Sequence, residues 1–292
     1  MRYRSRSYTV FSILNYFFIG LLSLLCIMPL IHILAVSLSS KGAVTANEVT
    51  FWPIGFTFDA YMQTIGNKNF LHALQIGVLR TVLGTLISMT VITMAAYSLS
   101  RTGTRFRGRN IYAWFFVFVM LFNAGLIPTY LVVSRTGLMD SLWALVIPNA
   151  VNVWNMILML NFFRGLPQEL EEAALIDGAG HFRTLFSIFI PVSMPAMATM
   201  TLFTMVFHWN SWFDGIIYLS KMNDYPLASF LHTILVQENF SQVGLDLGKV
   251  QQISNRTVKA SQIFIGAIPI LLVYPVLQKY FVKGLVLGSV KG

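Results

Sequence analysis

The chain has 292 residues, of which 56% are hydrophobic and only 11% are charged, and its formal net charge is +9. Soluble globular domains contain about 25% charged residues, so this composition excludes an ordinary water-soluble protein. The positive charge does not indicate nucleic-acid binding, because Lys and Arg gather in short clusters between apolar stretches, as they do beside membrane spans.

The N-terminal segment has some features of a secretory signal. Three arginines, Arg2, Arg4 and Arg6, precede an apolar run over 10–36, and Ala35-Val36-Ser37 resembles a cleavage site. The apolar core of a signal peptide has about 7–15 residues, and this run is nearly twice as long. We therefore expect a retained first membrane helix rather than a cleaved leader.

Six stretches are long and apolar enough to cross a bilayer, whose core about 30 Å thick needs about 20 helical residues. Each should be a helix, because no open strand or loop satisfies its backbone polar groups in hydrocarbon. The sequence therefore predicts an all-α integral membrane protein with a single transmembrane domain over 1–292. The expected spans are roughly 11–37, 70–100, 111–133, 142–162, 192–219 and 261–282.

Basic residues are unevenly distributed between the two sets of connecting segments. They are more frequent in 1–10, 101–110, 163–191 and 283–292 than in 38–69, 134–141 and 220–260. Cytoplasmic segments carry the excess of Lys and Arg. This pattern predicts a multi-pass protein with both termini in the cytoplasm.

The segment 163–191 differs from an ordinary connector, because it holds four of the eleven acidic residues. Its pattern predicts two short helices separated by a turn, where Gly178 can adopt a positive φ. Pro191 is expected to end the second helix. The segment could lie on the membrane surface as an amphipathic connector or dock onto a protein. Its acidic residues favour a protein, since a helix on an anionic leaflet should be basic.

Parts of this segment resemble a known motif. Glu172-Ala173-Ala174, Gly178 and Ile188-x-Ile190-Pro191 resemble the cytoplasmic EAA loop of binding-protein-dependent ABC-importer permeases, although Ile190 stands where Leu is usual. Asp177-Gly178-Ala179 is similar to the form common in sugar permeases. Residues 95–101, Trp209-Asn210 and 278–292 extend the resemblance. It is strongest to the smaller permease subunit of maltose-type and related oligosaccharide importers, including the lipoprotein-operon-like subgroup.

The resemblance implies a fold, a function and a set of partners. The fold would be that of type I ABC-importer permeases, with six transmembrane helices and a cytoplasmic coupling-helix loop at 163–191. The chain would translocate a sugar or oligosaccharide by alternating access in a bacterial plasma membrane. The residues implied in coupling to an ATPase are Glu172, Ala173, Ala174, Asp177, Gly178, Ala179 and Pro191.

The implied partners are a cytoplasmic ATPase dimer, a second homologous permease subunit that completes a heterodimer, and an extracellular or periplasmic sugar-binding protein. The sequence has no phosphate-binding loop of the Gly-x4-Gly-Lys-Ser/Thr type. We therefore expect no enzymatic activity, no catalytic residue and no bound cofactor in this chain, with ATP used by the partner. The histidines show no metal-ligand spacing, so we expect no metal site.

Two groups of polar and aromatic residues fall within the predicted fourth and fifth spans. Polar groups at such positions generally face the bundle interior or a water-filled cavity, where amides and aromatic rings would suit a sugar. Alternatively, the asparagines join helices by hydrogen bonds and the tryptophans anchor at the interface. Both interpretations stay open. The candidate pathway residues are Asn149, Asn152, Asn155, Trp209, Asn210 and Asp214.

The outer stretch 220–260 is long for a connector. The resemblance suggests that it meets the binding protein, and an ordinary outer loop is equally compatible with its sequence. A stand-alone secondary transporter or channel is the alternative function. That class predicts inverted repeats or mid-span ionisable residues. Apart from Lys279 at the membrane edge, only Arg80 and Asp214 are charged within the expected spans.

Overall fold

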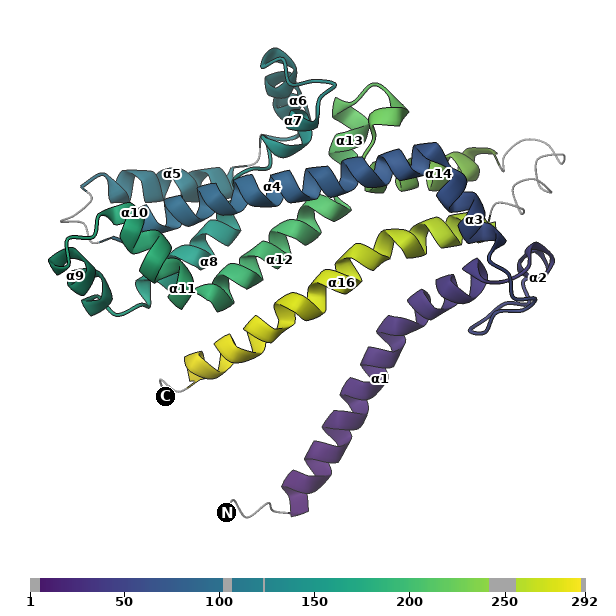
Figure 1. The fold of residues 1–292 in the computed structure, drawn as a ribbon, viewed down its shortest axis with the longest axis horizontal. Coiled ribbons are helices and arrows are strands. Elements are labelled where there is room, and N and C mark those ends of the chain that lie inside the picture. Colours follow the sequence, from purple (N-terminus) through teal and green to yellow (C-terminus); the bar gives the residue numbers. More distant parts are fainter. Residues whose placement is uncertain (1–5, 102–106, 123, 242–255, 290–292) are drawn as a thin grey trace. The chain divides into compact units, whose positions relative to one another are not determined.

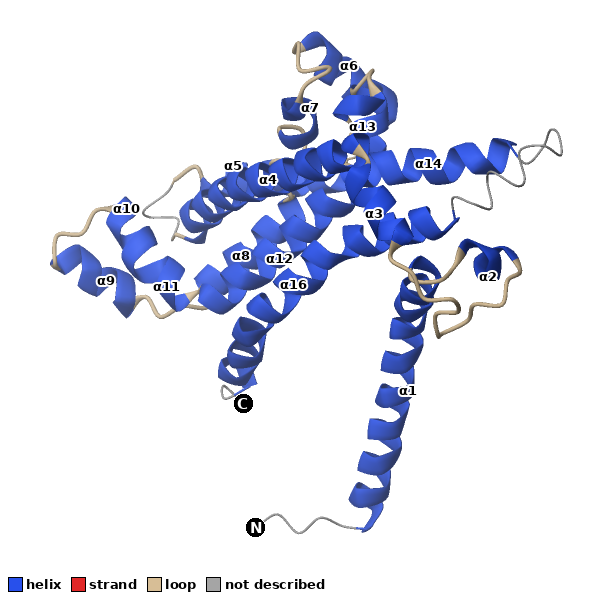
Figure 2. Ribbon diagram, turned by 45° about the vertical axis from the view of Figure 1, so that its right-hand side comes forward, coloured by secondary structure: helices blue, strands red, loops and turns tan. Residues whose placement is uncertain are grey.

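The computed structural model describes residues 6–101, 107–122, 124–241 and 256–289, and every regular element in these ranges is a helix (Figures 1 and 2). The chain divides into two compact units, one formed by 1–70 with 233–268 and the other by 71–232 with 269–292. The helices longer than five residues, apart from those of the 163–191 segment, are α1 (Arg6–Ser37), α3 (Asp59–Gly66), α4 (Lys68–Ser100), α5 (Arg109–Leu121), α6 (Leu126–Arg135), α8 (Val153–Arg164), α12 (Met194–Asn210), α13 (Phe213–Tyr218), α14 (Leu227–Ser241) and α16 (Arg256–Ser289).

Three of the expected spans lie within one continuous helix each. Residues 11–37 fall in α1, 70–100 in α4 and 261–282 in α16. The other three are divided, with 111–133 shared by α5 and α6, 142–162 by α7 (Leu142–Val146) and α8, and 192–219 by α12 and α13. By length and composition three described helices can cross a membrane, or up to five if each bent pair counts as one span. The total of six spans and the single domain stay predictions.

The divided spans have local causes. Gly125, with φ of 82°, separates α5 from α6, and this left-handed conformation interrupts a helix. Pro148 lies between α7 and α8, where a missing N–H and a bulky ring prevent helix continuation. The side chain of Asn152 then caps α8 by accepting the Asn155 N–H at 3.0 Å.

The first unit is held by a small core and a polar contact. Ala35 of α1 packs with Ala43, Val44 and Val49 of the following turn region. The hydroxyl oxygens of Thr64 on α3 and Ser261 on α16 lie 2.5 Å apart. Small residues at this position let the two helices approach closely, as in other membrane bundles.

The second unit contains the main core. Side chains of α4, α8 and α12 pack together, and the 163–191 segment closes one end of this bundle (Figure 1). A second cluster joins α6, α7 and α13 around Leu145 and Tyr218. Next to it, the carboxylate of Asp140 accepts hydrogen bonds from the Ser220 N–H at 2.6 Å and the Ser220 hydroxyl at 3.1 Å. These hydrogen bonds lower the pKa of Asp140.

Helix α4 lies close to the His208 ring of α12 at Gly84. A Cβ atom at this position would lie 2.6 Å from Cε1 of His208, whose side chain is buried. Only glycine fits without moving the ring. Gly84 therefore sets the distance between the two helices.

We expect Gly84→Ala to lower the melting temperature of the purified protein, measured by circular dichroism in detergent. Overpacking costs about 1–3 kcal/mol, which exceeds the gain of about 1 kcal/mol in helix propensity. Gly20→Ala on α1 is the matched control, because a Cβ there meets nothing within 4 Å. Equal melting temperatures for the two variants would contradict the close approach.

Candidate functional site

The 163–191 segment forms two helical pieces around a tight turn. It comprises α9 (Glu169–Ile176), α10 (His181–Thr184), the π-helix η1 (Leu185–Phe189) and α11 (Ile190–Val192). Gly178 has φ of 74°, which confirms the expected left-handed turn. The Gly178 N–H donates to the Leu175 carbonyl at 3.0 Å and the Ala179 N–H to the Ala174 carbonyl at 2.9 Å. This pair of bonds is a Schellman motif, so the turn has a defined geometry.

The expectation that Pro191 ends the second helix is wrong. Pro191 lies in the first turn of α11, where its missing N–H is tolerated, and the helix continues to Val192. Immediately before it, the Ile190 N–H donates to the Leu185 carbonyl, five residues earlier. The break follows at Ser193, where the axis turns by 87° into α12.

Helix α9 has one exposed face and one buried face. Ala173 and Ile176 are exposed, and the exposed fraction of Ile176 reaches 86%. Ala174 and Glu171 are buried, with exposed fractions of 4% and 7%. Among the other residues implied in coupling, Glu172, Asp177, Gly178 and Pro191 are exposed and Ala179 is half-buried.

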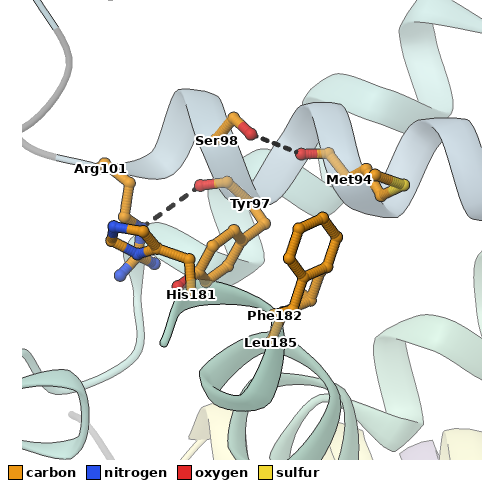
Figure 3. Close-up of a pocket in the computed structure, with 7 residues that line it drawn as sticks. All are labelled: Met94, Tyr97, Ser98, Arg101, His181, Phe182 and Leu185. Atoms are coloured by element: carbon orange, nitrogen blue, oxygen red, sulfur yellow. Dashed lines mark hydrogen bonds between the residues drawn. The ribbon is translucent and has the colours of Figure 1, made fainter. Parts of the chain in front are cut away.

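The buried face of α9 is attached to the end of α4 by an ion pair. Arg101, the residue after α4, pairs through Nη1 with Oε2 of Glu171, and only 8% of Arg101 is exposed. The Cζ atom of Arg101 lies 4.4 Å from the ring centroids of both Tyr97 and Phe189, so the guanidinium packs against two aromatic rings. Figure 3 shows Arg101 beside Tyr97, with Arg101 Nε donating to the Tyr97 carbonyl at 3.3 Å.

Three aromatic side chains support this arrangement. The ring centroid of Phe189 lies 5.2 Å from that of Tyr97 and 5.6 Å from that of Phe163, and both pairs meet edge to face. The three residues come from α4, α8 and η1. The ends of two bundle helices and the 163–191 segment thus form one packed body.

Two hollows flank this body. An apolar one of about 330 Å³ lies between α4 and α10, with Met94, Phe182 and Leu185 in its wall (Figure 3). A polar one of about 450 Å³ lies at the base of α9. Its charged lining residues are Arg101, Arg109, Arg164, Glu171 and Glu172.

Sequence reasoning did not place Arg101 or Glu171 in a site. Arg101 entered only as part of the stretch 95–101 that extends the family resemblance and of the basic stretch 101–110, and Glu171 only as one of the four acidic residues of 163–191. The available signal was that Glu171 precedes the buried Ala174 by three residues, which puts both on one helix face. Nothing in the sequence links that face to a residue 70 positions earlier.

A third cavity, of about 560 Å³, gathers three of the six candidate pathway residues. Asn149, Asn210 and Asp214 line it together with four aromatic residues. These aromatic residues are Phe207, Trp212, Phe213 and Tyr218. Amides, a carboxylate and ring faces in one cavity match the chemistry of sugar recognition.

The other three candidates lie elsewhere. Asn152 caps α8, and the buried Asn155 joins α8 to α12 by donating from Nδ2 to the Thr204 hydroxyl at 3.4 Å. Trp209 is half-buried on α12 and is not among the residues that line the cavity. These contacts of Asn152 and Asn155 agree with the helix-joining interpretation.

Arg80 holds the carboxylate of Asp214 at the cavity wall. Its side chain is completely buried, its two Nη atoms contact the two carboxylate oxygens, and Nη1 also donates to the Ser211 carbonyl at 2.7 Å. Asn149 Nδ2 donates to the same carboxylate at 3.3 Å. The opposite charges compensate each other, as buried ionisable groups in membrane proteins require. Within the described ranges, no group of three or more His, Cys, Asp or Glu residues lies together as metal ligands would.

Comparisons with known proteins agree with one another. A family model described as the binding-protein-dependent transport system inner membrane component matches residues 103–287. The polygalacturonan/rhamnogalacturonan transport system permease protein YtcP of Bacillus subtilis (strain 168) is 38% identical over 97% of this chain and 99% of its own. The maltodextrin transport system permease protein MdxG of the same organism is 29% identical over 96% of each.

Among solved structures, similarity is found to a chain of a bacterial ABC transporter involved in the import of the acidic polysaccharide alginate. The TM-score is 0.84 and the sequence identity 33%. The match covers 96% of this chain and 100% of that chain. The similarity thus extends over nearly all of this chain rather than over one motif.

The turn after α9 allows a matched test of backbone strain. A Cβ at Gly178 or at Gly180 meets nothing within 4 Å, but only Gly178 has a positive φ. We expect Gly178→Ala to cost about 1 kcal/mol or more because Ala is strained in the left-handed region. Hydrogen exchange of the Ala179 amide, which donates to the Ala174 carbonyl, should then be about five-fold faster or more relative to its intrinsic rate. Gly180→Ala should leave exchange at Ala179 unchanged, and equal rates in both variants would contradict the assigned turn.

Proposed function

The chain belongs to the family of binding-protein-dependent transport system inner membrane components, and on that premise we propose that it imports a sugar or oligosaccharide as one permease subunit of an ATP-driven transporter. The similarity to the alginate importer confirms the expected all-α fold of type I ABC-importer permeases. Family membership also makes it a membrane transport subunit rather than an enzyme. The alternative of a stand-alone secondary transporter or channel is thereby disfavoured.

One observation carries the proposed coupling to an ATPase: α9 is fixed on one face and exposed on the other. The buried face holds Glu171 and Ala174, while Glu172, Ala173 and Ile176 are free to meet a partner. Ala173 has almost no side chain, so a partner surface can approach the backbone closely. A rigid helix with an exposed acidic and apolar face is better suited to docking onto a protein than to lying on a lipid surface.

The remaining partners follow from symmetry and orientation. An ATPase dimer offers two equivalent docking sites and this chain offers one loop, so we place a second, homologous permease subunit beside it. The basic residues near the ends of α4, α5 and α8 support a cytoplasmic position for the loop and for both termini. ATP would bind to the ATPase, and a sugar-binding protein would deliver cargo from outside. Part of the outer stretch 220–260 lies outside the described residues, so its contact with that protein stays a prediction.

The transport systems to which the similar proteins belong suggest a narrower class of substrate. One relative transports polygalacturonan and rhamnogalacturonan, and the similar structure belongs to an importer of alginate. We propose an acidic oligosaccharide as the substrate. The cavity at Asn149 and Asp214 supplies amides and aromatic faces for sugar hydroxyls and rings. Because Arg80 compensates the charge of Asp214, this wall does not present an uncompensated negative charge to such a substrate.

Site-specific cross-linking tests the docking face. In a Cys26→Ser background, Ala173→Cys should be joined by a short thiol cross-linker to an ATPase subunit in the assembled transporter. Ala174→Cys is the matched control, because that position is one residue away and buried. Cross-linked product should be several-fold greater at 173 than at 174. Failure of 173 to capture any nucleotide-hydrolysing subunit would refute the proposed coupling.

Uptake by the reconstituted transporter tests the cargo class. We expect labelled trigalacturonate to be accumulated, and unlabelled trigalacturonate to compete better than maltotriose. The physical reason is that trigalacturonate carries a carboxylate on each sugar unit, whereas maltotriose carries none. Preferential competition by maltotriose would overturn the acidic substrate and leave the permease assignment standing.

A further inference from the structure

We infer that Arg101 and Glu171 form a mechanical link that transmits displacement of α9 along α4 to the cavity, with Arg101 acting as the positioning residue. This inference rests on the proposed function. It concerns how motion reaches the cavity, which neither the family nor its relatives' names specify. The observation behind it is that Arg80 within α4 and Arg101 directly after its last residue are both buried, and each pairs with a carboxylate of another element.

The first contact, at the α9 end, is rigid. The guanidinium of Arg101 is planar, packs against the rings of Tyr97 and Phe189, and donates to Glu171, the Ser100 hydroxyl and the Tyr97 carbonyl. The contacts with Tyr97 and Ser100 hold the guanidinium at the end of α4, so α9 could slide away only by breaking the contacts between Arg101 and Glu171. Breaking them would leave a charge in a buried site, which is strongly unfavourable. A force on α9 therefore moves the end of α4 as well.

The second step is the transmission of this displacement along α4. The helix runs over 33 residues from Lys68 to Ser100 and contains no proline. From Arg101 to Arg80 it covers 21 residues, or about 31 Å at 1.5 Å per residue. Its hydrogen-bonded backbone resists stretching and compression, so a displacement at one end reaches the other. The divided spans, with their breaks at Gly125 and Pro148, would bend instead.

The third step is the contact with the cavity. Arg80 holds Asp214 of α13 through both carboxylate oxygens, and Asp214 in turn accepts from Asn149. Asn149 and Asp214 both line the 560 Å³ cavity. A shift of α4 thus acts directly on the cavity wall through a buried ion pair. The route consists of α9, Glu171, Arg101, α4, Arg80 and Asp214, all within the second compact unit.

The test compares charge removal at the link with charge removal beside it. Glu171→Gln keeps the shape of the side chain and removes its charge. Glu169→Gln is the matched control, because it changes an exposed residue of the same helix. A second pair is Arg101→Gln against Arg164→Gln, since Arg164 is exposed at the end of α8. All variants are studied in the complete transporter, reconstituted with the ATPase, the second permease and the binding protein.

We expect Glu171→Gln and Arg101→Gln to copurify with the ATPase and to retain ATP hydrolysis in the absence of the binding protein. The amount of labelled trigalacturonate transported per ATP hydrolysed should fall at least several-fold. Both controls should keep the wild-type ratio. A merely structural role of the pair would lower the amount of assembled transporter without changing this ratio. An unchanged ratio in Glu171→Gln would therefore overturn the inference.

Arg101→Lys keeps the inference testable if the neutral variants fail to assemble. It retains a positive charge for Glu171 but replaces the flat guanidinium that packs against the two rings. We expect an assembled transporter with a reduced ratio of transport to hydrolysis. Loss of assembly in this variant too would assign a structural role and contradict the inference. Failure of the wild-type chain to bind an ATPase would instead refute the proposed function, so the two failures are distinguishable.

Discussion

The buried ion pair between Arg101 and Glu171 determines how the 163–191 segment is held. Buried ion pairs add little net stability, because the desolvation of both charges offsets their attraction, but removing one partner costs about 3–5 kcal/mol. Their main effect is therefore geometric. Here the pair selects one orientation of α9, directs Ala174 inwards and leaves Ala173 and Glu172 exposed. The docking face of the segment is a consequence of that orientation.

The hydrocarbon environment explains why polar contacts have such weight in this chain. Apolar side chains gain little by leaving lipid for protein, so small residues and hydrogen bonds largely set the packing between helices. Gly84 lets α4 approach His208, Thr64 meets Ser261, and Asn155 meets Thr204. The same environment requires that Arg80 be paired, and Asp214 supplies the partner at the cavity. The need to pair polar groups in hydrocarbon thus accounts both for these contacts between helices and for the ion pair at the cavity.

Local signals in the sequence predicted part of this structure. The apolar length of 70–100 gave a single helix, α4, and the glycine between two helical patterns gave the left-handed turn at Gly178. Pro191 was misjudged, because a proline ends a helix only where its N–H is needed, and the first turn of α11 does not need it. The pairing of Arg101 with Glu171 depends on how distant segments fold together, and no periodicity in the sequence records that. For the same reason the sequence did not show which of the six pathway candidates line a cavity and which join helices. Three of them line a cavity, and Asn155 joins two helices.

The most direct test of the link is a pulsed electron paramagnetic resonance distance between spin labels at Glu169 on α9 and Val91 on α4, both exposed positions outside the docking face. The measurement compares the complete wild-type transporter without nucleotide and with ATP trapped. If α9 and α4 move as one body, the mean distance is the same in both states. A change of several ångströms on ATP binding would show that α9 moves independently of α4, and the transmission through Arg101 would be contradicted.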